Sequence, residues 1–192
     1  EFNERSARLA AYLRDAWGVQ SGDRIAILGK NSTDYFEFQF ACIKLGAMML
    51  PLNWRLAEPE LLFILNDAEP VGLVYDGEFA ERIPGLMASP VRHFLRIDFG
   101  EPPTDDHPAY EDAITMTSDH VVMDEQTTHD TPMMIMYTAG TTGHPKGVII
   151  THGMMLWNAI NISTPTALSS ESVYYCVLPT FHIGGLNLYA NP

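Results

Sequence analysis

One stretch, rich in glycine and threonine and lying between two apolar runs, decides how the 192-residue sequence is interpreted. It reads Tyr137-Thr138-Ala139-Gly140-Thr141-Thr142-Gly143-His144-Pro145-Lys146-Gly147. Apolar residues 133–137 precede the loop, and the β-branched residues Val148, Ile149 and Ile150 follow it. This order predicts a strand, a loop and a second strand.

Three residue types in this loop suit phosphate binding. Glycine lets backbone N–H groups converge on an oxyanion, threonine hydroxyls add donors, and lysine supplies a full positive charge. The chain has only three lysines, Lys30, Lys44 and Lys146, and one of them lies here. We therefore predict a loop that binds a triphosphate.

Two other interpretations compete with this one. A plain hairpin turn needs two residues of special conformation, not a run of glycines and threonines with a lysine. A P-loop (Walker) site has the spacing of Gly140 and Lys146, but Pro145 replaces its second glycine and Gly147 its magnesium-binding hydroxyl. The strand expected after Lys146 also differs from the helix that a Walker loop opens.

The loop resembles the phosphate-binding signature of adenylate-forming enzymes, which include acyl-CoA synthetases, firefly-type luciferases and the adenylation domains of peptide synthetases. A second match is Leu178-Pro179-Thr180-Phe181-His182-Ile183-Gly184-Gly185-Leu186, and a third is Thr151-His152-Gly153. The three matches follow the family's order and spacing. Residues 152–158 and 181–185 look most like fatty and related acyl-CoA ligases. Before Met133 the resemblance is one of general pattern.

The resemblance implies an ATP-dependent carboxylate–CoA ligase that forms an acyl adenylate and then an acyl-CoA thioester, with ATP, Mg²⁺ and coenzyme A as cofactors. It makes Lys146 and His182 catalytic: Lys146 at the phosphates, His182 orienting the acyl carboxylate or gating its pocket. A histidine that caps a turn is the alternative role. The nucleotide would contact Thr138, Ala139, Gly140, Thr141, Thr142, Gly143, His144, Pro145 and Lys146. Ala139 stands where the family often has a hydroxyl.

Other parts of the family pattern are absent from the chain. We find no Tyr-Gly-x-Thr-Glu stretch for magnesium, no Tyr-x-Thr-Gly-Asp stretch for ribose and no late lysine segment. The chain also begins without methionine, inside a predicted helix at residues 3–17. We expect the N-terminal portion of a longer ligase, inactive alone and without its own metal site. The alternative is a non-catalytic α/β binding or scaffold module that keeps the loop.

Composition narrows the class of protein. Hydrophobic residues make up 46% of the chain and its net charge is −13, so we expect a substantial core and no nucleic-acid partner. No apolar run reaches the length of a transmembrane span. Cys42 and Cys176 lie in apolar runs and are expected to be buried free thiols of a cytoplasmic protein. Its partner would be a small carboxylic acid, and an exposed sheet edge would allow oligomers.

Upstream of the loop, predicted strands alternate with predicted helices. The strands are 24–29, 47–52, 71–75 and 91–97, and the helices are 3–17, 35–46, 57–67, 78–83 and 110–115. Near-continuous apolar strands predict an α/β fold, a mostly parallel sheet with helices on both faces. In the second helix, Phe36, Phe40, Ile43 and Leu45 are expected to point inward.

Further elements are expected around and after the loop: strands at 131–137, 147–151 and 172–178, a helix at 153–162 and another from Gly184. We divide the chain into a first α/β subdomain (1–117), an acidic linker (118–131) and a phosphate-loop segment that starts a second subdomain (132–192). His120 and His129 lie in the linker among acidic residues, but without fixed ligand spacing we expect surface polar groups there, not a metal site.

Overall fold

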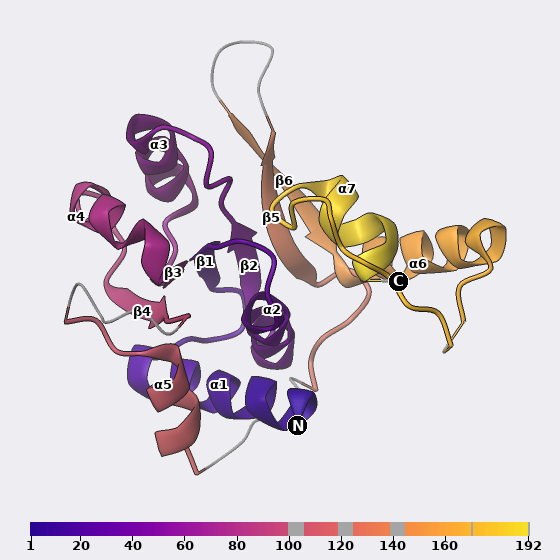
Figure 1. Cartoon of the computed structure of the whole chain (residues 1–192), viewed down its shortest axis with the longest axis horizontal. Coiled ribbons are helices and arrows are strands. Elements are labelled where there is room, and N and C mark those ends of the chain that lie inside the picture. The colour runs from indigo at the N-terminus through magenta and orange to yellow at the C-terminus, as the bar shows by residue number, and fades with distance from the viewer. Residues whose placement is uncertain (100–105, 119–124, 139–144, 170, 192) are drawn as a thin grey trace.

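A six-stranded sheet forms the centre of the fold. The computed structural model describes residues 1–99, 106–118, 125–138, 145–169 and 171–191. The strands lie in the order β4-β3-β1-β2-β5-β6 (Figure 1). The parallel strands are β1 (Arg24–Leu28), β2 (Met48–Pro51), β3 (Gly72–Asp76), β4 (His93–Ile97) and β5 (Pro132–Thr138). The edge strand β6 (Lys146–Thr151) runs antiparallel to β5. The predicted, mostly parallel sheet is confirmed.

Helices cover both faces of this sheet, as expected (Figure 1). One face carries α1 (Phe2–Trp17), α2 (Thr33–Leu45) and α5 (Tyr110–Met116). The other carries α3 (Glu58–Ala68), the 3₁₀ helix η1 (Gly77–Arg82) and α4 (Ile83–Leu86). Side chains of β1 alternate between the two cores: Ile25 and Ile27 belong to the first, Ala26 and Leu28 to the second.

Local sequence explains where the helices begin and end. The Ser32 hydroxyl accepts a hydrogen bond from the Tyr35 amide at 3.1 Å and so caps α2. Gly46 ends this helix in the left-handed conformation, with φ at 64°. Pro59 lies in the first turn of α3, where a missing N–H breaks no hydrogen bond of the helix.

The buried face of α2 agrees only in part with the predicted one. Phe40 is 41% exposed, and Phe36 and Ile43 are only partly buried. Leu45 is buried as expected, but the large aromatic in the core is Phe38, which is fully buried. The prediction was wrong for Phe40, whereas Phe36 and Ile43 do pack against the core. Apolar residues occur all round this helix, so their periodicity does not select one face.

The C-terminal part also departs from expectation. α6 (His152–Thr166) is longer than predicted, while α7 (Ile183–Gly185) and the π-helical turn η2 (Leu186–Ala190) agree with a helix from Gly184. Residues 172–178 form no strand. They are rich in strand-favouring residues but pair with no described sheet edge, and Val173 is 98% exposed.

The environments of the two cysteines differ. Cys42 is buried, as predicted, whereas Cys176 is only partly buried because it lies in the irregular segment. Both thiols are free.

β5 and β6 join the same sheet as the first four strands, through the pairing of Met134 with Met49. The subdomain division at the acidic linker stays a prediction. Residues 119–124 of that linker, with His120, lie outside the described residues, as do residues 100–105. Among the helices that are described, none combines the length and apolar character needed to cross a membrane.

Candidate functional site

The Gly-rich stretch connects the antiparallel strands β5 and β6 (Figure 1). Thr138 and Lys146 form the last pair of the register, so they lie opposite each other where the connection leaves the sheet. The predicted site residues Ala139, Gly140, Thr141, Thr142, Gly143 and His144 lie outside the described residues. The strand expected after the loop is present as β6, where a Walker site would have a helix.

Gly147 allows a close approach between the two strands of this hairpin. A Cβ atom at Gly147 would lie 2.9 Å from Ile135 Cγ2 and 3.2 Å from Tyr137 Cζ. The Tyr137 hydroxyl donates a hydrogen bond to Asp67 in α3, which ties the hairpin to the neighbouring helix. Burial, together with this carboxylate, raises the pKa of Tyr137 above its ordinary value.

A cavity of about 330 Å³ lies where β2 and β5 end. Three parts of the chain line it: the end of β2 with α3, the base of the hairpin, and the segment before α7. The lining residues are Pro51, Asn53, Leu56, Glu60, Ile64, Tyr137, Thr138, Pro145, Phe181 and His182. The carboxyl ends of parallel strands are the usual ligand-binding edge of such sheets.

Three of the predicted site residues, Thr138, Pro145 and His182, meet in this cavity. Lys146 follows Pro145, is exposed, and forms no ion pair with any described residue. Its ammonium group and the exposed Thr138 hydroxyl are donors of the kind that phosphate oxygens accept. The described base of the hairpin therefore fits a phosphate group.

His182 takes the alternative role of capping a turn, and its role toward an acyl carboxylate stays a prediction. Its Nδ1 accepts a hydrogen bond from the Gly184 amide at 3.1 Å and caps α7. Its side chain also lines the cavity. A neutral imidazole that accepts at Nδ1 carries its proton on Nε2. Capping the turn therefore leaves one N–H donor for an oxygen atom of a ligand.

One cavity wall was not predicted from the sequence: it runs from the end of β2 into α3 and includes Asn53, Leu56 and Glu60. Arg82 holds this wall by donating from Nη1 to the Trp54 carbonyl at 2.8 Å and from Nη2 to the Leu56 carbonyl at 2.5 Å. One signal could have found it: Asn53 is the first polar residue after a buried strand, at the sheet edge where ligands bind.

Aromatic contacts fix the opposite wall. The Phe181 ring meets Trp54 edge-on with the ring centroids 6.1 Å apart. Trp54 in turn stacks on Phe79 of η1 at 6.2 Å. The guanidinium carbon of Arg55 lies 4.8 Å from the Trp54 centroid and 5.8 Å from that of Phe181. The segment before α7 is thus packed against the loop after β2.

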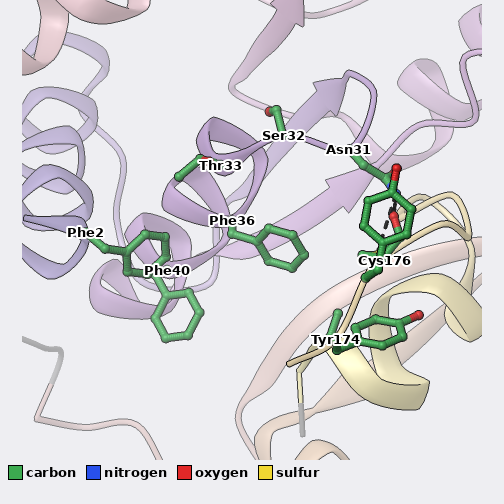
Figure 2. Close-up of a pocket in the computed structure, with 10 residues that line it drawn as sticks. Phe2, Asn31, Ser32, Thr33, Phe36, Phe40, Tyr174 and Cys176 are labelled. Carbon is green, nitrogen blue, oxygen red and sulfur yellow. Dashed lines mark hydrogen bonds between the residues drawn. The ribbon is translucent and has the colours of Figure 1, made fainter. Parts of the chain in front are cut away.

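A larger groove of about 580 Å³ is lined in part by residues 174–176 (Figure 2). Half of its ten lining residues are aromatic: Phe2, Phe36, Phe40, Tyr174 and Tyr175. It contains none of the predicted site residues. The smaller cavity is therefore the better candidate site, because hydroxyl, imidazole and carboxylate groups converge on it.

Within the described residues, no three His, Cys, Asp or Glu side chains are grouped so that they could hold a metal ion. The described part of the chain therefore supplies no preformed cation site.

Comparison with known proteins finds relatives that match nearly the whole chain. The AMP-binding enzyme family model matches residues 1–191. The chain is 38% identical over 185 residues to the indoleacetate–CoA ligase of Aromatoleum aromaticum, covering 96% of this chain and 36% of that protein. It is 38% identical over 193 residues to the feruloyl-CoA synthase of an Amycolatopsis species, covering 100% of this chain and 36% of that protein.

A solved structure agrees with the whole fold. The ATP-bound MatB of Rhodopseudomonas palustris aligns with a TM-score of 0.83 at 25% identity, covering 100% of this chain and 37% of that one. The chain thus spans 36–37% of the length of these relatives.

Proposed function

The chain belongs to the AMP-binding enzyme family, and from that premise we propose that it is the N-terminal part of an ATP-dependent carboxylate–CoA ligase. In the first step a carboxylate oxygen attacks the α-phosphorus of ATP and pyrophosphate leaves. In the second step the thiol of CoA attacks the acyl carbon and AMP leaves. The observation that carries this proposal is the convergence of Thr138, Pro145 and His182 on one cavity beside Lys146.

The base of the hairpin has the chemistry for the phosphate end of this reaction. Charge develops on the departing pyrophosphate, and fixed donors that meet this charge lower the barrier. We assign that task to the Lys146 ammonium and the Thr138 hydroxyl, assisted by residues 139–144 of the loop. Lys146 suits this role because no described carboxylate neutralises it.

The cavity suits the carboxylic acid. Its volume of about 330 Å³ lies within the range of small-molecule pockets. His182 would donate from Nε2 to the carboxylate and orient it toward the α-phosphorus, with Phe181 as an apolar wall. Glu60 is less available, because its Oε2 already accepts a hydrogen bond from the Ala57 amide at 2.8 Å.

The magnesium ion that the reaction needs would depend on residues beyond the described part of the chain. Magnesium would be held by the phosphates and by residues outside the described part, because that part has no carboxylate cluster.

The relatives named for indoleacetate and ferulate support an aromatic acid as the substrate, and the resemblance to fatty acyl-CoA ligases supports an aliphatic one. We place the reaction in the cytoplasm. An aliphatic acid as the substrate would give the protein a role in fatty acid metabolism.

Product analysis tests this function. The complete natural protein that contains these residues is incubated with ATP, Mg²⁺, CoA and one acid at a time: indoleacetate, ferulate or a fatty acid. We expect an acyl-CoA and an equal amount of AMP, detected by mass spectrometry. ATP binding without acid-dependent AMP formation from any acid would favour the non-catalytic binding module instead.

A further inference from the structure

The candidate site depends on a segment without regular secondary structure. Residues 173–178 belong to no helix or strand, yet they lead directly to Phe181 and His182 in the cavity wall. A segment of this kind is held in place by side-chain contacts, because it lacks the repeated backbone hydrogen bonds of a helix or sheet.

The side chain of Asn31 forms hydrogen bonds with this segment and with Thr180, which follows it. The Asn31 Nδ2 group donates to the Leu178 carbonyl at 2.8 Å and to the Cys176 carbonyl at 3.1 Å. Its Oδ1 atom accepts from the Thr180 amide at 2.9 Å and from the Thr180 hydroxyl at 3.0 Å. Figure 2 shows Asn31 reaching the segment beside Cys176. One amide group thus binds three residues that are about 145 positions away in the sequence.

The chemistry of these partners fixes the orientation of the amide. Two carbonyl oxygens can only accept, so they must face the NH₂ group, and the Thr180 N–H can only donate, so it must face the oxygen. Aspartate has nearly the same shape but could not donate to either carbonyl. Asparagine is the residue of this size that satisfies both sides.

The residues on either side of Asn31 in the chain form hydrogen bonds that hold its backbone in place. The Lys30 amide before it donates to Asp76 Oδ2 at 2.7 Å, at the end of β3. Ser32 after it caps α2. The side chain is therefore a short link between the rigid ends of β1 and α2 and the irregular segment.

We propose that Asn31 is a positioning residue for the carboxylate site, which it aligns by fixing Thr180 and so the adjacent Phe181 and His182. Thr180 is fully buried, so a shift there moves its neighbours with it. The catalytic consequence rests on the proposed ligase function, whereas the role in holding the segment does not.

Amide hydrogen exchange tests the holding role without any activity. In the complete natural protein, the Thr180 amide is expected to be protected, and Asn31→Ala should raise its exchange rate by roughly tenfold or more, as for loss of one stabilising hydrogen bond. Asn66→Ala is the matched control. It removes an exposed asparagine whose Nδ2 donates to the Leu62 carbonyl within α3 at 2.8 Å, so it should leave Thr180 protection unchanged.

Kinetics test the catalytic consequence. Asn31→Ala should raise the KM for the carboxylic acid by roughly tenfold while the KM for ATP stays within about twofold, because the phosphate end of the site does not rest on Asn31. Adding Asn31→Ala to His182→Ala should cost little more than His182→Ala alone, since both changes remove the same orientation.

The outcomes separate the two claims. Unchanged Thr180 exchange in Asn31→Ala, or an equal increase in Asn66→Ala, would overturn the holding role. Equal increases in both KM values, or fully additive effects with His182→Ala, would overturn the positioning role. If the wild-type protein makes no acyl-CoA, the ligase function and the positioning role fall together, and exchange still decides whether Asn31 holds the segment.

Discussion

Asp76 is a carboxyl group that the fold keeps out of water at the end of β3. It is 1% exposed, and only its Oδ2 atom has a partner, the Lys30 amide; Oδ1 has none among the described residues. Burial raises the pKa of Asp76 to about 7, against the opposing effect of the Lys30 amide, and the nearby charges of Glu78 and Asp34 raise it further.

This pKa predicts a pH-dependent stability. Between the unfolded pKa of about 3.9 and the folded value, the native state binds a proton that the unfolded state has lost. The contribution of Asp76 to the free energy of unfolding is therefore present at low pH and declines until about pH 7. Asp76→Asn removes this decline. Between pH 5 and pH 8, the free energy of unfolding of the variant should therefore rise by about 2 kcal/mol relative to that of the wild type. Urea unfolding at both pH values measures this gain, and equal pH dependence in the two proteins would refute it.

Single residues of the site were predictable only where their chemistry is local. Thr138, Lys146 and His182 stand out because their types and spacing form a recognisable pattern. Asn31 and Asn53 do not, because their roles arise from partners far away in the sequence. The bonds from Asn31 to Thr180 exist only once β1 and the segment before α7 are brought together by the fold.

At the scale of one helix, α2 offers a matched pair of aromatic residues. Phe38 is fully buried in the core with α1 and the sheet, whereas Phe40 is 41% exposed and makes an edge contact with Phe2 at 5.4 Å. Phe38→Ala should lower the free energy of unfolding by about 3–5 kcal/mol, mainly through the cavity it leaves. Phe40→Ala should cost only about 1 kcal/mol, close to the value of one aromatic pair.

Urea unfolding of the two variants separates the observed face of α2 from the predicted one. A larger loss for Phe40→Ala than for Phe38→Ala would mean that the helix is turned toward the face expected from sequence. Near-equal losses would also contradict the structure.

The elements that sequence predicted well are those whose pattern is set locally. β1 and β3 are short apolar runs between helix stops, and α3 has its proline at the first turn. The strand predicted at residues 172–178 is absent for the opposite reason. Their composition favours a strand, but a strand also needs a neighbouring edge, and only the tertiary structure shows that no described edge is paired with them.

At the scale of the molecule, the sheet order creates the site. β5 lies next to β2, so the base of the Gly-rich hairpin reaches the loop between β2 and α3. The segment before α7 closes the third side. Under the proposed function, the net charge of −13 makes the positive charge of Lys146 more important, because the overall field opposes the approach of an anion such as ATP.

The phosphate-binding role of the hairpin is tested most directly by the exchange of pyrophosphate into ATP that depends on the carboxylic acid substrate. It is measured on Lys146→Ala in the complete natural protein. Loss of one charge-assisted phosphate contact should cost about 1.5–3 kcal/mol, roughly a 10- to 150-fold fall in exchange. Arg8→Ala, which removes a positive charge on distant α1, should leave exchange near the wild-type rate. If Lys146→Ala exchanges as fast as Arg8→Ala, the hairpin does not hold the phosphates and the account fails at its centre.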